Sequence, residues 1–329
     1  MKIPACSLGA FLILGAPLAF SQNWTESTFP HELAPAARLG GAMAYIPTEG
    51  GSVLFGGLTS SRGGPLSLSD TWVLAPVTGW TQLKVTGPSA RFDVSMVWDS
   101  LHSQAVLFGG GDWVNNGIIF MLNDTWTWNG STWTQQFPAN SPPPRYVYAM
   151  AYDSLHNQTV VFGGYTPNGY VGDTWVYDGV NWTEKFPANS PSARSGAEMT
   201  WDANSNAVIL FGGVNGSTVY SDTWAWNGTN WTQLFPATVP APRYAQTICW
   251  DNGEKQSVMF GGTNEATNLA DTWAWTGTNW VEYFPVISPT MRFSSMMDFD
   301  TSLNKMILFG GGASAKIGDI YVNDTWGWW

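Results

Sequence analysis

The chain has 329 residues, of which 24 are acidic and 13 are lysine or arginine, so its formal net charge is −11. This acidic balance excludes nucleic acid and anionic membrane surfaces as its main partners. Only 11% of the residues are charged, whereas 36 are glycine and 21 are tryptophan, a composition found in many exported β-proteins.

The first 21 residues predict an export signal. Lys2 gives a short basic start, an apolar segment follows, and Ala19-Phe20-Ser21 fits the small-residue pattern of a cleavage site. We therefore expect a signal peptide at 1–21 and one domain at 22–329 that is secreted, periplasmic or attached to the cell surface. No second apolar run follows, so we expect no membrane span.

The same landmarks recur six times along the remaining chain. Each unit opens with an arginine, reaches a Gly-Gly pair 18 residues later, and continues with an Asp-Thr-Trp triplet. A regular internal period of this size predicts a repeat architecture. The six opening arginines are Arg38, Arg91, Arg145, Arg194, Arg243 and Arg292. A second tryptophan recurs at Trp24, Trp80, Trp133, Trp182, Trp231 and Trp280.

Each unit is expected to hold four strands, named a to d in chain order. Strand a alternates large apolar residues with small ones, which is the period of a β-strand. Strand b is a short apolar run that ends at Gly-Gly, where a positive φ or a close backbone approach is possible. Strand c begins at Asp-Thr-Trp, and strand d carries the second tryptophan. Asn-Gly or Asp-Gly joins them in units two, three and four, which indicates a hairpin turn.

The two ends of the repeat array complement each other. Asn23-Trp24-Thr25 stands ahead of the first unit and matches strand d of the others, whereas the chain stops at Trp329 with a strand c that lacks its strand d. We predict that the first strand pairs beside the last one and completes the sixth unit. Such closure leaves no unpaired seam, which every β-protein must avoid.

These residues resemble the kelch repeat, in which a diglycine follows an apolar strand and a spaced aromatic pair ends in tryptophan. The resemblance covers residues 22–329 and implies an all-β fold, a six-bladed kelch-type β-propeller closed by its N-terminal strand. It says little about chemistry, because kelch propellers include binding modules, scaffolds and a few enzymes.

The connections between strands b and c vary most. From the first glycine to the aspartate of Asp-Thr-Trp they span 14, 15, 10, 10, 10 and 14 residues, while the other hairpin connections are nearly uniform. The long b–c loops belong to units six, one and two, which are consecutive in a closed ring. They should form a wall on the face that also bears the d–a loops, where function is expected. Trp113, Phe120 and Tyr321 lie on them and either pack together to hold the loops or form an exposed binding lip.

The six arginines open the innermost strand at the same face. They are therefore candidates for a ring at the mouth of the central channel, where guanidinium groups bind a carboxylate, a sulfate or an acidic peptide. The resemblance supports this, since some kelch domains bind acidic partners with arginines. The structural alternative is that each arginine bonds backbone of a neighbouring blade or the aspartate of Asp-Thr-Trp.

Nothing in the sequence predicts a catalytic residue, a metal site or a cofactor. The galactose-oxidase type of kelch enzyme needs a copper site of Tyr, Cys and His, and no residues here match it. Cys249 is expected to be a small buried side chain. Asp93 and Glu198 share the parity of the arginines and would face the channel mouth, either as an acid–base pair or in salt bridges with the arginine ring.

The leading functional hypothesis is a non-catalytic binding module that is exported and monomeric. Its ligand, a protein segment or an acidic glycan, would contact the face of the b–c and d–a loops. One alternative is an enzyme on an acidic sugar, similar to the kelch-type sialic acid mutarotases. Another is a structural surface protein.

Overall fold

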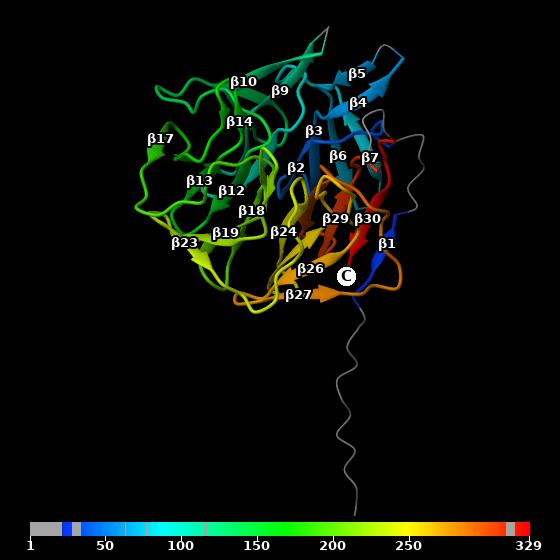
Figure 1. Ribbon diagram of the computed structural model, residues 1–329. Helices are drawn as coiled ribbons and strands as arrows, with labels where there is room; N and C mark the ends of the chain where they lie inside the picture. Colours follow the sequence, from blue (N-terminus) through cyan, green and yellow to red (C-terminus); the bar gives the residue numbers. More distant parts are fainter. Residues whose placement is uncertain (1–21, 28–33, 63, 77, 115–116, 314–319) are drawn as a thin grey trace, which may run out of the picture.

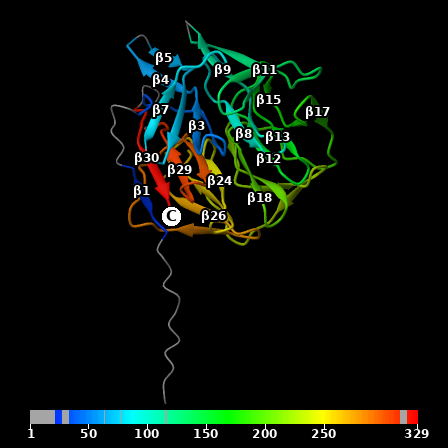
Figure 2. The same cartoon turned by 180° about the vertical axis from the view of Figure 1, so that it is seen from behind.

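The computed structural model describes residues 22–27, 34–62, 64–76, 78–114, 117–313 and 320–329. The expected signal peptide at 1–21 lies outside these residues. In the described part of the chain every regular element is a β-strand, and no helix is present that could cross a membrane. Six four-stranded antiparallel sheets are arranged around one axis, with the first strand of each unit innermost (Figures 1 and 2).

The first three blades hold the strands in the order a, b, c, d from the axis outwards. Blade one consists of β2 (Ala42–Ile46), β3 (Gly51–Phe55), β6 (Thr71–Ala75) and β7 (Gly79–Leu83). Blade two consists of β8 (Ser95–Asp99), β9 (Gln104–Val114), β10 (Ile118–Trp128) and β11 (Trp133–Gln136). Blade three consists of β12 (Ala149–Asp153), β13 (Gln158–Phe162), β16 (Thr174–Tyr177) and β17 (Trp182–Lys185).

The other three blades repeat this arrangement. Blade four consists of β18 (Glu198–Asp202), β19 (Ala207–Phe211), β22 (Thr223–Trp226) and β23 (Trp231–Leu234). Blade five consists of β24 (Thr247–Asp251), β25 (Gln256–Phe260), β26 (Thr272–Trp275) and β27 (Trp280–Tyr283). Blade six consists of β28 (Met296–Asp300), β29 (Lys305–Phe309), β30 (Thr325–Trp328) and, from the other end of the chain, β1 (Trp24–Glu26).

The pairing of β1 with β30 confirms the predicted ring closure. Trp24 lies opposite Trp328 and Glu26 opposite Trp326 in an antiparallel register (Figure 1). A side-chain bond reinforces the seam, since Asn23 Oδ1 accepts the N–H of Val286 at 2.9 Å. Elsewhere in the ring, the asparagine before the second tryptophan makes the same bond to the preceding blade. These asparagines are Asn181, Asn230 and Asn279.

The recurring tryptophans and threonines connect neighbouring blades. In all six blades the strand-d tryptophan is buried and its Nε1–H donates to the threonine of Asp-Thr-Trp in the preceding blade, at 2.9–3.0 Å. A buried indole needs such an acceptor, because an unsatisfied N–H inside the protein is costly. The closing strand takes part, with Trp24 donating to Thr272. The tryptophan excess is therefore mainly architectural.

The Gly-Gly pairs allow the blades to approach at the inner end of strand b. Gly163 and Gly164 both have positive φ values, 66° and 105°. A side chain on Gly163 would lie 2.6 Å from the carbonyl oxygen of Arg194 in the next blade, and the Gly164 N–H donates to that same oxygen. Only glycine fits both the conformation and the contact.

Candidate ligand-binding face

The six blade arginines are structural. Their side chains are 0–1% exposed. In blade three, the guanidinium of Arg145 makes two bonds of 2.7 Å to the Asp173 carboxylate and one of 3.0 Å to the carbonyl of Gly163. The other five blades repeat this pattern, with the pairs Arg38–Asp70, Arg91–Asp124, Arg194–Asp222, Arg243–Asp271 and Arg292–Asp324.

This placement agrees with the structural alternative, in which each arginine bonds the aspartate of Asp-Thr-Trp. It corrects the other expectation, that Arg38, Arg91, Arg145, Arg194, Arg243 and Arg292 ring the mouth of the channel. The residues that line the channel include none of the six. The reason is the aspartate that opens strand c. It lies beside the arginine of the same blade, and its carboxylate accepts hydrogen bonds from both terminal nitrogens of the guanidinium. A ligand could engage these guanidinium groups only by breaking a buried ion pair.

The long loops of blades one and two form two hairpins that lie side by side. The first is β4 (Leu58–Ser61) with β5 (Gly64–Ser67), and the second is the extended end of β9 and β10 (Figure 1). The backbone N–H of Trp113 donates to Ser67 Oγ at 2.7 Å and joins them. In the third long loop, Gly312 bridges to Tyr321, while residues 314–319 lie outside the described chain.

The three predicted loop residues are placed differently. Trp113 and Tyr321 are half-buried and pack against a cluster formed by Leu39, Leu58 and Phe92. Their packing supports the loops, as in the first of the two alternatives. Phe120 is 61% exposed and, with Ile118 at 62%, leaves an apolar edge on the β9–β10 hairpin. Of the three, Phe120 is the most exposed.

A row of aromatic side chains leads from this hairpin across the face. Ring centroids of Trp113 and Phe92 are 6.5 Å apart, Phe92 and Tyr146 6.1 Å, and Tyr146 and Tyr165 5.9 Å. Tyr165 then meets Tyr170 at 5.0 Å, edge to face. We call these residues, Trp113, Phe92, Tyr146, Tyr165 and Tyr170, the aromatic row.

The aromatic row ends in a surface hollow of about 420 Å³ over blades three to five. Tyr146, Tyr165, Tyr170 and Tyr244 line it, together with the exposed carboxylate of Glu265. The b–c loops of these blades are short, and they leave open the space that the long b–c loops fill over the other blades. Tyr165 and Tyr170 belong to a small hairpin, β14 (Tyr165–Thr166) with β15 (Gly169–Tyr170), and blade four carries its equivalent, β20 (Val214–Asn215) with β21 (Thr218–Val219).

Sequence reasoning missed these tyrosines, although a signal was present. Tyr146 and Tyr244 directly follow a blade arginine, and Tyr165 directly follows a Gly-Gly pair. The structure pairs these two repeat positions in every blade through an isolated bridge, such as Tyr146 with Tyr165. The side chains at the two positions vary from blade to blade, from Ser195 to Phe293. Such variation on a constant frame marks a binding face.

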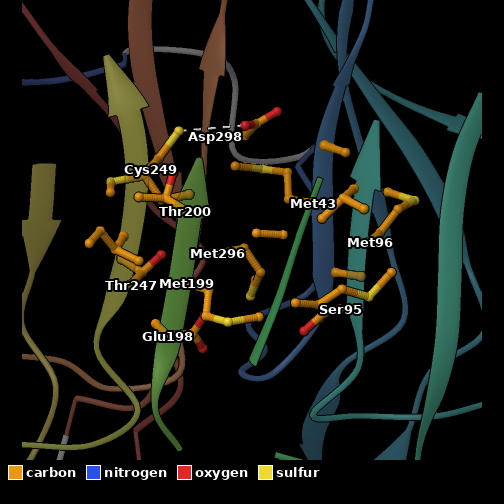
Figure 3. A pocket seen from close by; sticks show the side chains of 18 of the residues that line it. Met43, Ser95, Met96, Glu198, Met199, Thr200, Thr247, Cys249, Met296 and Asp298 are labelled. Carbon is orange, nitrogen blue, oxygen red and sulfur yellow. Dashed lines mark hydrogen bonds between the residues drawn. The ribbon is translucent and has the colours of Figure 1, made fainter. Parts of the chain in front are cut away.

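The central channel contains a cavity of about 390 Å³ lined by the innermost strands of all six blades (Figure 3). Asp93 and Glu198 line it, as their parity predicted. Neither forms an ion pair with the blade arginines, so the expected salt bridges are not present among the described residues. Deeper in, Asp298 accepts the Tyr45 N–H and lies 3.5 Å from the Cys249 thiol, which is buried as expected.

Burial of the two carboxyls changes their acidity. It raises the pKa of Asp93 to about 7. It also raises the pKa of Glu198 to about 8, with the nearby negative charge of Asp93 as a second cause. Both groups therefore hold protons in the folded protein at pH values where they are ionised in the unfolded chain, and folding becomes less favourable as the pH rises.

We expect Glu198→Gln to stabilise the protein at alkaline pH. The unfolded carboxyl ionises near its ordinary pKa of 4.5, so the difference from the parent protein grows from there and levels off above about pH 8. The gain at that plateau should be on the order of 2 kcal/mol, since a cavity open to water partly relieves the burial cost. Urea unfolding at pH 5 and pH 9 measures it. Glu254→Gln, an exposed carboxylate in an a–b turn, should change neither value; an equal gain at pH 5 would contradict the titration argument.

Comparison with known proteins agrees with this architecture. The family model described as the KLHDC2/KLHL20/DRC7 Kelch-repeats domain matches residues 40–236 and 129–281. Together with the six-bladed fold, this shows that the chain belongs to the kelch-repeat family. The search of curated proteins found no match. Kelch-repeat propellers generally act as protein-interaction modules, which directs attention to the irregular face of the ring.

Proposed function

We propose that the protein is an exported, monomeric interaction module that binds a protein segment across the aromatic row and the hollow. The observation that carries the proposal is the set of half-buried tyrosines, Tyr146, Tyr165 and Tyr170, whose rings contact one another at a concave site on the face of variable loops. Trp113 packs against them through the buried ring of Phe92. Aromatic side chains supply much contact area at low entropic cost and dominate protein recognition sites.

The other ligand classes have less support. An acidic glycan would need free cationic groups, and the blade arginines are occupied by Asp70, Asp124, Asp173, Asp222, Asp271 and Asp324. The same pairing weakens the proposal of an enzyme on an acidic sugar, which would set Asp93 or Glu198 beside a free arginine. A purely structural role gives no reason for a solvent-open hollow with four tyrosines.

Selection of short random peptides displayed on phage tests the proposal. We expect the protein to enrich peptides whose affinity falls roughly tenfold or more in Tyr165→Ala and in Tyr170→Ala, as measured by calorimetry. Phe186→Ala serves as the matched control, because that ring is 84% exposed on the outer rim. Peptides that lose affinity equally in the control, or that bind both tyrosine variants like the parent, would place the site elsewhere.

A further inference from the structure

We propose that the hollow recognises a cationic side chain, a lysine or an arginine, in the bound protein segment. The inference rests on the proposed function and specifies the chemistry of that site. Its starting point is the geometry of the tyrosines. The rings of Tyr165 and Tyr170 are at 87° to each other, and those of Tyr146 and Tyr165 at 75°. Nearly perpendicular rings form a corner in which a cation can lie over one ring face.

The charge of the hollow favours a cation as well. Among the described residues that line it, Glu265 is the only acidic one, and no lysine or arginine is present. The Tyr244 ring and the Glu265 carboxylate both line the hollow, and burial, together with the charge of Glu265, raises the pKa of Tyr244. Glu265 has a left-handed backbone conformation, with φ of 71°.

The hollow borders the central channel. Val147 lines both the hollow and the central channel, so the two are adjacent. Burial raises the pKa of Asp93, on the channel side, to about 7, so this carboxyl adds negative charge beside the hollow only above neutral pH. Arg194, which directly precedes the lining residue Ser195, is paired with Asp222, and its guanidinium lies over the ring of Tyr220 at 3.9 Å. The lining of the hollow therefore combines one carboxylate, Glu265, with an electron-rich aromatic surface.

The ligand chemistry follows from these two features together. An ammonium or guanidinium group is attracted both by ring faces and by a carboxylate, whereas an anionic group is repelled by each. A neutral apolar side chain gains only the contact area. The aromatic row leading to the hollow is apolar, so the segment that fits best carries one basic residue beside apolar or aromatic ones.

Three phage libraries that differ at one fixed central residue test the inference. One carries lysine there, one leucine and one glutamate, with random residues on both sides. We expect the lysine library to be enriched at least tenfold over the other two, and its peptides to lose roughly tenfold in affinity in Glu265→Gln and in Tyr244→Leu. Glu254→Gln removes the same charge from the opposite end of blade five and should leave the affinity unchanged.

The outcomes separate this inference from the proposed function. Equal enrichment of the lysine and leucine libraries, with peptides that still depend on Tyr165, would leave the binding face in place and overturn the cationic ligand. Enrichment of the lysine library with equal losses in Glu265→Gln and Glu254→Gln would show attraction by net charge alone and would also overturn it. If no library is enriched, both the proposed function and the cationic ligand fail.

Discussion

Replacing one blade arginine by methionine should cost the protein about 3–5 kcal/mol of unfolding free energy. Arg145→Met is the cleanest case, because it lies in blade three, away from the seam in blade six. The change removes two bonds to Asp173 and one to the carbonyl of Gly163, and leaves a carboxylate only 21% exposed without its counter-charge. The midpoint of urea unfolding at pH 7 measures the loss.

The pKa of Asp173 shows why the loss is large. Burial alone would raise this pKa, yet the hydrogen bonds and charge of Arg145 outweigh burial and hold it below its ordinary value of 3.8. Without Arg145 the burial effect remains, and the Asp173 carboxylate lowers the stability of the folded protein at every pH where it is ionised. Asp173 also accepts the indole N–H of Trp175 at 2.7 Å, so the loss spreads to strand c.

Two variants control this experiment. Arg62→Met makes the same substitution at an exposed arginine in the β4–β5 turn and should change stability by less than about 0.5 kcal/mol. Arg145→Lys keeps the charge but cannot make the bidentate contact and the carbonyl bond together. Its unfolding free energy should therefore lie between those of the parent and of Arg145→Met. An Arg145→Met protein that unfolds at the same urea concentration as Arg62→Met would show that the buried pair adds no stability.

The sequence predicted the blades and their closure because those features repeat. A tryptophan, a diglycine and an Asp-Thr-Trp triplet at constant spacing can be compared across units, and the unmatched Trp24 and Trp328 strands complete each other. Arginine orientation could not be read in the same way. The alternation along a strand predicts on which face of the sheet a side chain lies. Whether the side chain is exposed to solvent there depends on which other residues pack on that face.

For the arginines, the sequence contains the aspartate that pairs with each one, but it does not show that the two residues lie side by side. Every unit has one arginine and one aspartate of Asp-Thr-Trp, separated by 28 to 33 residues, and only the sheet order brings them together. The tyrosine hollow required the fold for a similar reason. Tyr146 and Tyr244 lie 98 residues apart in the chain and share a surface only because blades three and five flank blade four.

Opening the ring at its closing strand should have a large effect as well. Trp24→Ala removes a side chain that is 0% exposed and packs against Phe260 at 5.2 Å and Trp328 at 5.1 Å. It also deletes the bond to Thr272 that ties blade six to blade five. Truncating a fully buried tryptophan costs about 3–5 kcal/mol. Urea unfolding should show this loss relative to Phe235→Ala, an aromatic truncation at a ring 84% exposed.

The place in the structure where hydrogen exchange accelerates distinguishes a loss of ring closure from an ordinary loss of core packing. Strand β1 pairs with β30 through three residues, and Trp24 is its only buried side chain, so without Trp24 the strand is held mainly by backbone pairing and by the Asn23 bond to Val286. The amides of Thr325–Trp328 should then exchange with solvent faster than those of β22 in blade four, and the exposed edge of β30 should promote aggregation. Trp231→Ala, at the matching place in blade four, should cost similar free energy without selective exchange at β30. If Trp24→Ala and Trp231→Ala accelerate exchange in β30 equally, the ring unfolds as one unit and its seam has no special weakness.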